Sequence, residues 1–392
     1  MIKLEKPPSI LALAAITGLA PFTLNIIVPS LPSISDYYNV TYSSAQLVIT
    51  AFIAAMAIGQ LIIGTLSDAY GRRSILMIGI FVFIVGSIIC SIAPTIEMLI
   101  FGRFIQALGG VSGVVLGRAI VRDVYGREKA ASALGYVTTV MVIAPMIAPV
   151  LGGLLEDFVG WRSSFYVLFF TGILLIIMAY NGIKETNIDN RSRGDIKTLL
   201  YNFIILLRIR KFVLFTLTMA CANSMFFTFL AVAPYIIIKI LEFSPTQYGF
   251  GFIPISIAFM LGSFTAARLS ERIGSLKLIK IGVFGGILGS VVMGVVIYHN
   301  LMNIYTLFGS MMIITYSNGI VMPNIIANIV SVKPELAGAA SGLSGSMQFA
   351  LAGICTYIAA SISIETAFPM AMQLVLLSSI GTISFLIAKS SK

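Results

Sequence analysis

The residues that could move charge or protons are unevenly placed in this sequence. Arg103 is the one charged residue well inside a long apolar run, whereas all 15 Asp and Glu residues fall in polar gaps or at the ends of apolar runs. A charge inside a membrane-spanning segment costs several kcal/mol unless it is paired or hydrated, and it usually faces the interior of a helix bundle. Arg103 is therefore either a functional charge inside a bundle or a structural one, close enough to the membrane surface to snorkel and bonded to a neighbouring carbonyl.

The other reactive side chains form no catalytic or metal-binding pattern. The single histidine, His299, lies in a short gap, and Cys90, Cys221 and Cys355 lie inside apolar runs, where cysteine is a small core residue. A membrane-embedded enzyme would need a nucleophile with a base, or a cluster of His and carboxylate ligands. We therefore expect no enzyme activity, no metal and no cofactor.

The composition requires elements that cross a membrane. Of 392 residues, 58% are hydrophobic and 10% are charged, and the mean hydropathy is +1.01, whereas a soluble domain has roughly 25% charged residues. A helix needs roughly 20 apolar residues to cross the hydrocarbon core. The apolar runs predict an all-α polytopic protein with twelve transmembrane helices, near residues 9–29, 44–66, 74–94, 98–121, 131–154, 163–183, 212–238, 247–268, 276–298, 302–330, 336–361 and 366–388. The 302–330 run could be one helix that is broken near Pro323.

The net charge of +10 is arranged as in a membrane protein. Most of the 25 Lys and Arg residues precede the first run, fill the even-numbered gaps or follow the last run, whereas the odd-numbered gaps hold only Arg162 and Lys239. Cytoplasmic loops carry such an excess of Lys and Arg. We expect both termini in the cytoplasm and no nucleic-acid partner.

The longest polar interruption divides the chain into two similar parts. We expect an N-terminal six-helix bundle over residues 1–184, a cytoplasmic linker over 185–211 and a C-terminal six-helix bundle over 212–392. Residues 196–209 of the linker mix apolar and basic side chains, which fits either a helix on the membrane surface or an ordinary basic linker. Transporters commonly have two such related halves, with the substrate site between them near the membrane centre.

A loop motif after the second run recurs in the second half. It reads Gly64-xxx-Asp68-xx-Gly71-Arg72-Arg73 in the first half and Arg268-Leu-Ser-Glu271-Arg272-Ile-Gly274 in the second. Glycine permits close helix approach and a tight turn, and an acid with arginines can hold neighbouring helix ends together. The first copy resembles the cytoplasmic loop signature of the major facilitator superfamily, and this resemblance implies a conformational or gating role for Gly64, Asp68, Gly71, Arg72 and Arg73.

Further stretches resemble the drug-export branch of that superfamily. Arg103-Phe-Ile-Gln106-Ala-Leu-Gly109 is similar to its Arg-xx-Gln-Gly motif, and Ala144-Pro145-xx-Ala148-Pro149-xx-Gly152-Gly153 is similar to its antiporter signature. With Arg118-Ala-Ile-Val-Arg122-Asp123, Ala233-Pro234-Tyr235 and Ala337-Gly-Ala-Ala-Ser341, the chain looks like the bicyclomycin and chloramphenicol resistance subfamily.

That resemblance implies a mechanism and a location. The expected activity is secondary active, proton-coupled efflux of small amphipathic compounds by alternating access. The protein would act as a monomer in the inner membrane of a bacterium. Arg103 would take part in proton coupling, and the seam formed by Pro145, Pro149, Gly152 and Gly153 would be a barrier to leak.

The sequence departs from the subfamily at Asn25. The subfamily has an aspartate four residues before the first proline of a Pro-x-x-Pro element, which is Pro29-Ser-Leu-Pro32 in this chain. Because asparagine cannot titrate, coupling could have moved to Asp123 or to a rim carboxylate such as Asp36 or Glu97, or transport could be uncoupled. The coupling candidates are therefore Arg103, Arg118, Asp123 and Asn25.

Polar or aromatic residues within the apolar runs are the candidates for the substrate cavity. They are Asn25, Gln60, Asn223, Tyr235, Asn318 and Gln348. Each could equally form only an interhelical hydrogen bond. The rival to drug efflux is a carrier that takes up or exchanges a specific metabolite without protons. Efflux is favoured because anionic nutrients usually require buried arginines, and only Arg103 is available.

Overall fold

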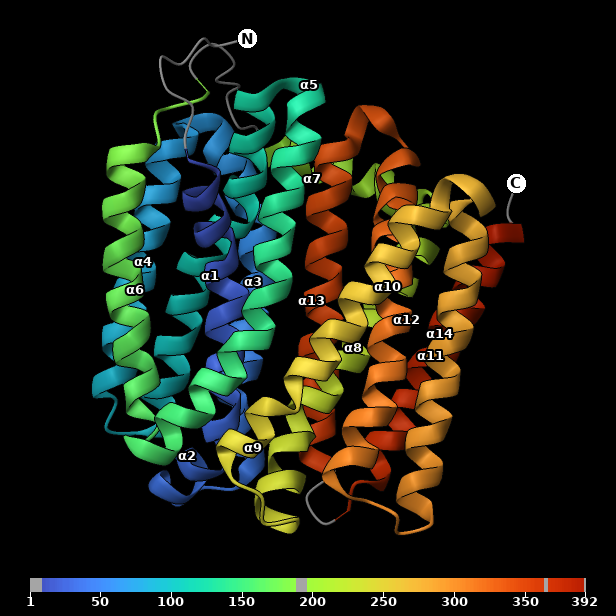
Figure 1. Cartoon of the computed structure of the whole chain (residues 1–392). Coiled ribbons are helices and arrows are strands. Elements are labelled where there is room, and N and C mark those ends of the chain that lie inside the picture. The colour runs from blue at the N-terminus through green and yellow to red at the C-terminus, as the bar shows by residue number, and fades with distance from the viewer. Residues whose placement is uncertain (1–8, 188–195, 363–365, 391–392) are drawn as a thin grey trace.

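The computed structural model describes residues 9–187, 196–362 and 366–390, and within these ranges every regular element is helical (Figure 1). The expected all-α polytopic fold is confirmed. The α-helices are α1 (Ile10–Ile26), α2 (Leu31–Tyr38), α3 (Tyr42–Tyr70), α4 (Arg72–Ile92), α5 (Ile96–Phe158), α6 (Arg162–Gly182), α7 (Ile196–Arg208), α8 (Arg210–Pro234), α9 (Pro245–Phe250), α10 (Phe252–Ile273), α11 (Ser275–Tyr298), α12 (Ile304–Ser331), α13 (Ala337–Ile362) and α14 (Phe368–Ser390). Two short 3-10 helices, η1 (Val28–Ser30) and η3 (Pro334–Leu336), and one π-helix, η2 (Tyr235–Ile240), lie between some of them.

Helix α5 contains two of the predicted spans and folds back on itself. A straight helix of its 63 residues would be about 95 Å long, about three times the thickness of the hydrocarbon core. Its first leg approaches α1 at Gly113 and Ile16, and its second leg approaches α1 at Gly152 and Ile26. The two legs meet at the top of Figure 1.

The number of spans follows from this reversal. Within the described residues, eleven helical stretches are long and apolar enough to cross a membrane, and one of them is the first leg of α5, Ile96–Tyr125. The second leg, which corresponds to the predicted run 131–154, is the twelfth.

The chain forms two helical halves that lie side by side. α1 to α6 pack among themselves, as do α8 and α10 to α14, and the halves meet where α3 contacts α13 and where α5 contacts α9 and α10. The boundaries expected at residues 184 and 212 stay a prediction. Residues 188–195 of the expected linker lie outside the described residues, and its second part forms α7.

One expectation about proline is corrected. The helix of the first predicted span, α1, ends at Ile26, and the chain continues through η1 and α2 to Tyr38. The break considered near Pro323 is wrong, because α12 runs unbroken from Ile304 to Ser331. A proline removes only one helix hydrogen bond, and packing on neighbouring helices can offset that loss.

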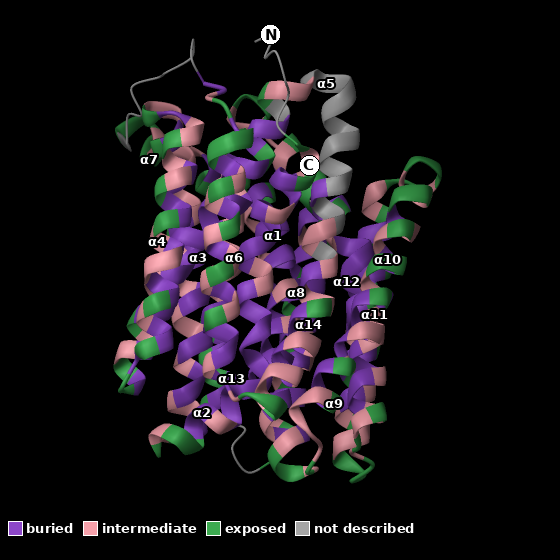
Figure 2. Ribbon diagram, turned by 60° about the vertical axis from the view of Figure 1, so that its left-hand side comes forward, coloured by how far each residue is buried: buried purple, intermediate pink, exposed green. Residues whose placement is uncertain are grey.

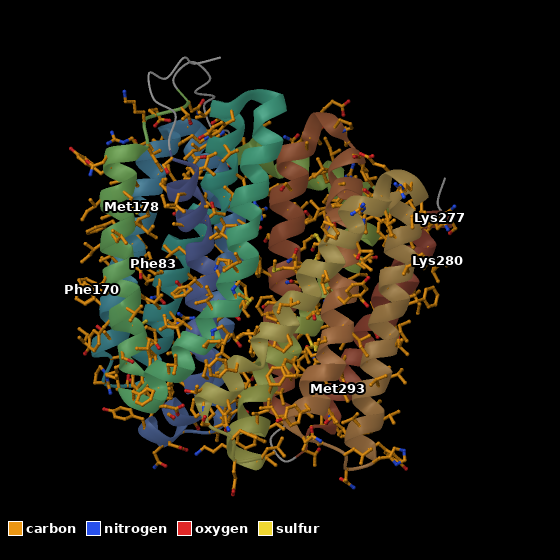
Figure 3. All side chains as sticks on the ribbon, viewed as in Figure 1. Phe83, Phe170, Met178, Lys277, Lys280 and Met293 are labelled. Carbon is orange, nitrogen blue, oxygen red and sulfur yellow. The ribbon has the colours of Figure 1, made fainter. Side chains whose placement is uncertain are left out.

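The pattern of burial fits a protein surrounded by lipid. Buried residues fill the inside of the helix bundle, and exposed ones lie on its outside (Figure 2). On the outer surface, Phe170 of α6 is 65% exposed and points away from the bundle, whereas Phe83 of α4 is fully buried (Figure 3). Many other large apolar side chains are equally exposed, which is expected where the surrounding solvent is hydrocarbon.

We name the two ends of the bundle by the chain termini. The N- and C-terminal ends of the chain lie at one end of the bundle, here called the terminal side, together with the turn between α3 and α4 and the turn between α10 and α11. The opposite end, which holds α2 and α9, is called the distal side.

Candidate functional site

Arg103 lies fully buried on the first leg of α5, enclosed by backbone carbonyls and an aromatic ring. Its Nη1 donates to Thr23 O of α1 at 3.3 Å, and its Nε donates to Val48 O of α3 at 3.4 Å. The guanidinium lies 4.2 Å from the ring centre of Phe52, which is a cation–π distance. The guanidinium therefore does not reach the surface as a snorkelling side chain would, and the expected carbonyl bonds are present. The depth of Arg103 in the membrane stays a prediction.

The Arg-xx-Gln spacing extends this cluster to a fourth helix. Arg103 and Gln106 are three residues apart and share one face of α5, so Arg103 Nη1 donates to Gln106 Oε1 at 2.7 Å. Gln106 Nε2 then donates to Ser87 Oγ of α4 at 2.8 Å. Among the described residues no carboxylate pairs with Arg103, and its Nη2 is buried without a hydrogen-bond partner there.

Asn25 occupies the position where the subfamily has an acid. Only 2% of the residue is exposed, and its Nδ2 donates to Pro21 O of the preceding turn at 2.8 Å. Its Oδ1 is buried without a hydrogen-bond partner among the described residues. The amide therefore bonds to its own helix, and the structure describes no bond between it and Arg103.

The loop between α3 and α4 forms a charged network on the terminal side. Arg72 Nη1 lies 2.7 Å from Asp68 Oδ1, and Arg72 Nε lies 3.3 Å from Asp123 Oδ2 at the far end of the first leg of α5. Glu185, which follows α6, accepts the backbone N–H groups of Arg72 at 2.8 Å and Arg73 at 3.2 Å. Charge-assisted bonds here join three helices, α3, α4 and α5, to the segment that follows α6.

The two glycines of this loop motif differ in their surroundings. Gly71 has a φ of +98°, a conformation that residues with a side chain rarely adopt, and a Cβ there would overlap the Glu185 carboxylate. The expected tight turn is therefore present. A Cβ on Gly64 would meet nothing within 4 Å, so the close helix approach that we expected at Gly64 is absent in this conformation.

Residues of the expected seam lie where the second leg of α5 meets two other elements. A Cβ on Gly152 would overlap Ile26 O of α1, and one on Gly153 would overlap Pro245 O of α9 in the other half. Pro149 O is the nearest contact of Gly249 in α9, and Pro145 lies one turn earlier in the same leg. The seam thus forms a close backbone contact between the halves on the distal side.

Hydrogen bonds between the two halves lie on the distal side as well. Tyr42 Oη donates to Ala231 O at 2.9 Å, Ser43 Oγ donates to Ala360 O at 2.7 Å, Lys239 pairs with Asp36, and Thr246 N donates to Asp157 Oδ2 at 3.0 Å. The ring centres of Tyr42 and Tyr235 are 5.0 Å apart. The distal side is closed by these contacts.

A sequence profile of the Major Facilitator Superfamily matches residues 13–356. The chain belongs to this superfamily. It is similar to an uncharacterized MFS-type transporter, YdgK, of Bacillus subtilis, with 31% identity over 96% of this chain and 94% of the relative. It is also similar to a bicyclomycin resistance protein homolog of Haemophilus influenzae, with 25% identity over 92% and 91% of the two chains, and to a chloramphenicol resistance protein of Pseudomonas aeruginosa, with 25% identity over 95% and 88%. The resemblance drawn from the motifs is confirmed, and the protein is a multi-pass membrane transporter, not an enzyme.

The six cavity candidates of the transporter do not gather at one place. Asn318 of α12 is 6% exposed, and its Nδ2 donates to Ala222 O of α8 at 2.8 Å. Asn223 follows on α8, with its Nδ2 buried and without a partner among the described residues. Gln60 of α3 lies against Gly345 of α13, one turn before Gln348. Tyr235 belongs to the closed distal side, and Asn25 lies in α1.

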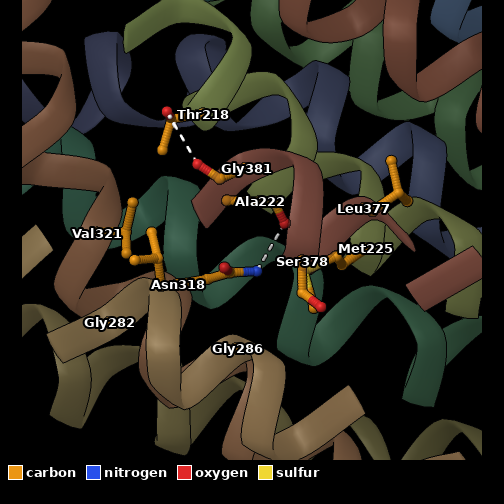
Figure 4. Close-up of a pocket in the computed structure, with 11 residues that line it drawn as sticks. Thr218, Ala222, Met225, Gly282, Gly286, Asn318, Val321, Leu377, Ser378 and Gly381 are labelled. Carbon is orange, nitrogen blue, oxygen red and sulfur yellow. Dashed lines mark hydrogen bonds between the residues drawn. The ribbon is translucent and has the colours of Figure 1, made fainter. Parts of the chain in front are cut away.

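A small cavity lies inside the C-terminal half, between α8, α11, α12 and α14 (Figure 4). Asn318 lines it beside Thr218 and Ser378, and small residues such as Gly282 and Gly286 leave the space. Of the six candidates it includes Asn318 alone. It is a packing space within one half rather than the expected substrate site between the halves.

The coupling candidates also lie apart. Arg118 is exposed toward the terminal end of the first leg of α5 and donates to Met141 Sδ at 3.4 Å. Asp123 accepts from Arg72 and, at 3.2 Å, from Thr186 Oγ1. Both are on the terminal side, separated along α5 from Arg103.

One titratable residue of the transporter, Glu156, was missed as a candidate. It lies at the distal end of α5, two residues beyond the predicted span, and burial raises the pKa of its carboxyl above the usual value. The neighbouring Asp157 raises this pKa further, whereas the Ser33 and Ser30 hydroxyls oppose the shift. In the sequence, an acid beside another acid at the end of an apolar run looks like an ordinary loop residue, so no signal distinguished Glu156.

Proposed function

We propose that this transporter exports small amphipathic compounds by alternating access. The observation that carries the proposal is the closed distal side, where hydrogen bonds and close backbone contacts join the two halves. A carrier with two related halves needs one state of this kind and a second state in which the same contacts are broken. The printed names of its relatives, bicyclomycin and chloramphenicol resistance proteins, support drugs as substrates.

The orientation follows from charge. The basic loops lie on the terminal side, so the terminal side is the cytoplasmic one and both termini are in the cytoplasm. The closed distal side then faces outward, so the described conformation is the one that is closed to the outside. We place the protein in a bacterial inner membrane and expect the monomer to be sufficient.

We also propose that export is coupled to protons, with Arg103 as the fixed charge of the coupling site. The positive charge of a fully buried guanidinium without a carboxylate partner disfavours a second cation nearby. It also favours the ionised form of an acid that comes close to it. Since Asn25 cannot titrate, the proton would be carried by a carboxylate elsewhere, either Asp123 or a rim residue such as Asp36 or Glu97, and Arg118 would be a second fixed charge.

A transport assay tests both proposals. Purified protein in liposomes with an imposed pH gradient should move an amphipathic dye or antibiotic against its gradient, and Asp123→Asn should abolish the dependence on pH if coupling runs through that residue. Gradient-dependent export that survives Asp123→Asn would refute that assignment. In an efflux-deficient bacterium, expression should raise resistance to several amphipathic compounds, and Arg103→Ala should remove that resistance.

The second candidate function is an uptake or exchange carrier without proton coupling. The observation in its favour is Asn25, whose neutral amide replaces the expected acid and bonds to its own helix. In that case solute exchange should be insensitive to the pH gradient, and Asn25→Asp should create a dependence that the natural chain lacks.

A further inference from the structure

Glu156 occupies a position that does not suit an ionised carboxyl. It lies on the second leg of α5, and its Oε2 is the one carboxylate oxygen among the described residues that is buried without a hydrogen-bond partner there. The hydroxyls of Ser30 in η1 and Ser33 in α2 face it. Ser30 is fully buried, and its hydroxyl likewise lacks a hydrogen bond of good geometry. The side chain is half-buried, and its Oε2 atom has lost water without gaining an N–H donor among the described residues.

The neighbouring carboxyl serves a different purpose. Asp157 accepts the backbone N–H of Thr246 at 3.0 Å and also the Thr246 hydroxyl, so its ionised form bonds to α9 of the other half. Glu156 is one residue earlier and faces the first half. Close backbone contacts between Gly152 and Ile26, and between Gly153 and Pro245, lie about one turn earlier on the same leg, and Glu156 itself is half-buried.

The charges around Glu156 do not neutralise it. On α5 itself the neighbour is Asp157, and on α2 the charged residue is Asp36, which pairs with Lys239 of η2. Arg162 of α6 donates to Tyr37 Oη and Ala93 O instead. α1, η1 and α9 contain no Asp, Glu, Lys or Arg, and Tyr248 of α9 is buried.

The remaining helices that contact α5 keep their charges far from this end. On α3, α4 and α10 the charged residues are Asp68, Arg72, Arg73, Arg268, Glu271 and Arg272, all on the terminal side. On the first leg of α5, Arg103 donates to Thr23 O, Val48 O and Gln106 Oε1 instead. Among the described residues, no ion pair therefore offsets a negative charge on Glu156.

We infer that Glu156 is a proton-binding site that takes up a proton from the distal-side water when this side closes and returns it when this side opens. The inference rests on the proposed alternating access. On closing, one proton from water converts the carboxylate to the acid, and on opening the rehydrated acid returns that proton to the same water. The proton is not carried across the membrane, so Glu156 adjusts the balance between the two states and is distinct from the coupling site.

The direction of the pH effect follows from linkage. The carboxyl has a raised pKa when the distal side is closed and an ordinary pKa, near 4.3, when it is hydrated. The closed state binds the proton more tightly, so protonation of Glu156 stabilises the closed state. This stabilisation is fully present below the ordinary pKa and is lost as the pH rises through the raised pKa. Between the two values the ratio of closed to open molecules changes by at most about tenfold per pH unit.

A distance measurement on the full chain in lipid nanodiscs tests the inference. Spin labels at Ile92→Cys and Tyr305→Cys report the separation of the halves, because both positions are exposed on the distal side of different halves. We expect the closed population to grow as the pH is lowered. Glu156→Gln, which keeps the shape of the acid but cannot ionise, should hold the population at its low-pH level at every pH.

A matched control and a second measurement complete the test. Glu242→Gln, at an exposed distal carboxyl of the other half, should keep the natural pH dependence. The unsubstituted chain should show an infrared carbonyl band of a protonated carboxyl at a pH at which an exposed Glu is ionised, which requires no variant to fold.

Three results would overturn the inference in distinguishable ways. If Glu156→Gln follows the natural pH dependence, or if the infrared band is absent, Glu156 is not the proton site. If the distance responds to added substrate but never to pH, the inference fails while alternating access stands. If the distance responds to neither, alternating access fails and the inference with it.

Discussion

The loops after α3 and after α10 occupy equivalent places in the two halves and share a backbone. Gly71 has φ +98° and ψ 147°, Gly274 has φ +85° and ψ 143°, and each N–H donates to a carbonyl four residues earlier. The side chains differ. Glu185 and Asp123 hold the first loop, whereas no ion pair of Glu271 or Arg272 is present among the described residues. The duplicated turn has kept its shape, and only the first copy is held by charges.

The centres of the two halves differ in the same way. The N-terminal half joins α1, α3, α4 and α5 through the buried charge of Arg103, whereas the C-terminal half joins α8 and α12 through the neutral amide of Asn318 beside a small cavity. Helices that are joined by a buried charge with several acceptors can pack in fewer alternative ways than helices that are joined by a neutral amide beside free space. We therefore expect the N-terminal half to be the more rigid body in any change of state.

The largest predicted effect separates Arg103 from Asn318. Arg103→Ala removes the donor of three hydrogen bonds and leaves Gln106 Oε1 and two carbonyls with fewer partners, so we expect a loss of about 3 kcal/mol or more in stability. Asn318→Ala removes one bond and should cost about 1–2 kcal/mol. Thermal unfolding of both variants in the same detergent measures the difference, and equal shifts in Tm would contradict the contrast between the halves.

The next effect compares the two turn glycines. Gly71→Ala forces an unfavourable φ, which costs about 1–3 kcal/mol, and also drives a methyl group into the Glu185 carboxylate. At Gly274→Ala the same strain applies, but nothing lies within 4 Å of the new Cβ. Tm should therefore fall further for Gly71→Ala. This difference in Tm between the two variants should become smaller when Glu185 is also replaced by alanine. If the difference persists in the Glu185→Ala background, contact with Glu185 is not its cause.

A smaller effect is expected from the ion pairs themselves. Glu185→Gln keeps the shape of the side chain but weakens two charge-assisted bonds to the N–H groups of Arg72 and Arg73, so we expect a loss of about 1 kcal/mol. Arg272→Gln, in the equivalent loop of the other half, should change stability by less than about 0.5 kcal/mol. Chemical or thermal unfolding gives both values, and a larger loss for Arg272→Gln would mean that the second loop also depends on its charges.

The sequence was sufficient to predict the helical spans and several contacts. Hydropathy identifies the spans because lipid requires long apolar helices, and the spacing of Arg103 and Gln106 places both on one helix face. The turn at Gly71 was also predictable, because an acid, a glycine and two arginines follow a span. These features depend on neighbours in the chain or on the membrane itself.

Other features depend on how distant segments pack. The acceptors of Arg103 are backbone carbonyls of Thr23 and Val48, and any residue type would supply them. The partial burial of Glu156 depends on η1 and α2, which are far from it in sequence. The free space around Gly64 likewise depends on how the two halves pack in this conformation, which the local sequence does not specify.

The smallest predicted effect concerns Gly64. Because a Cβ there meets nothing within 4 Å, Gly64→Ala should leave stability unchanged or raise it by up to about 1 kcal/mol through better helix propensity. Gly59→Ala, on the same helix, is the matched control and should lower Tm, because its Cβ would overlap Val111 of α5. A fall in Tm for Gly64→Ala as large as for Gly59→Ala would contradict the description of this site. A transport defect with unchanged Tm would assign the close helix approach at Gly64 to the state in which the distal side is open.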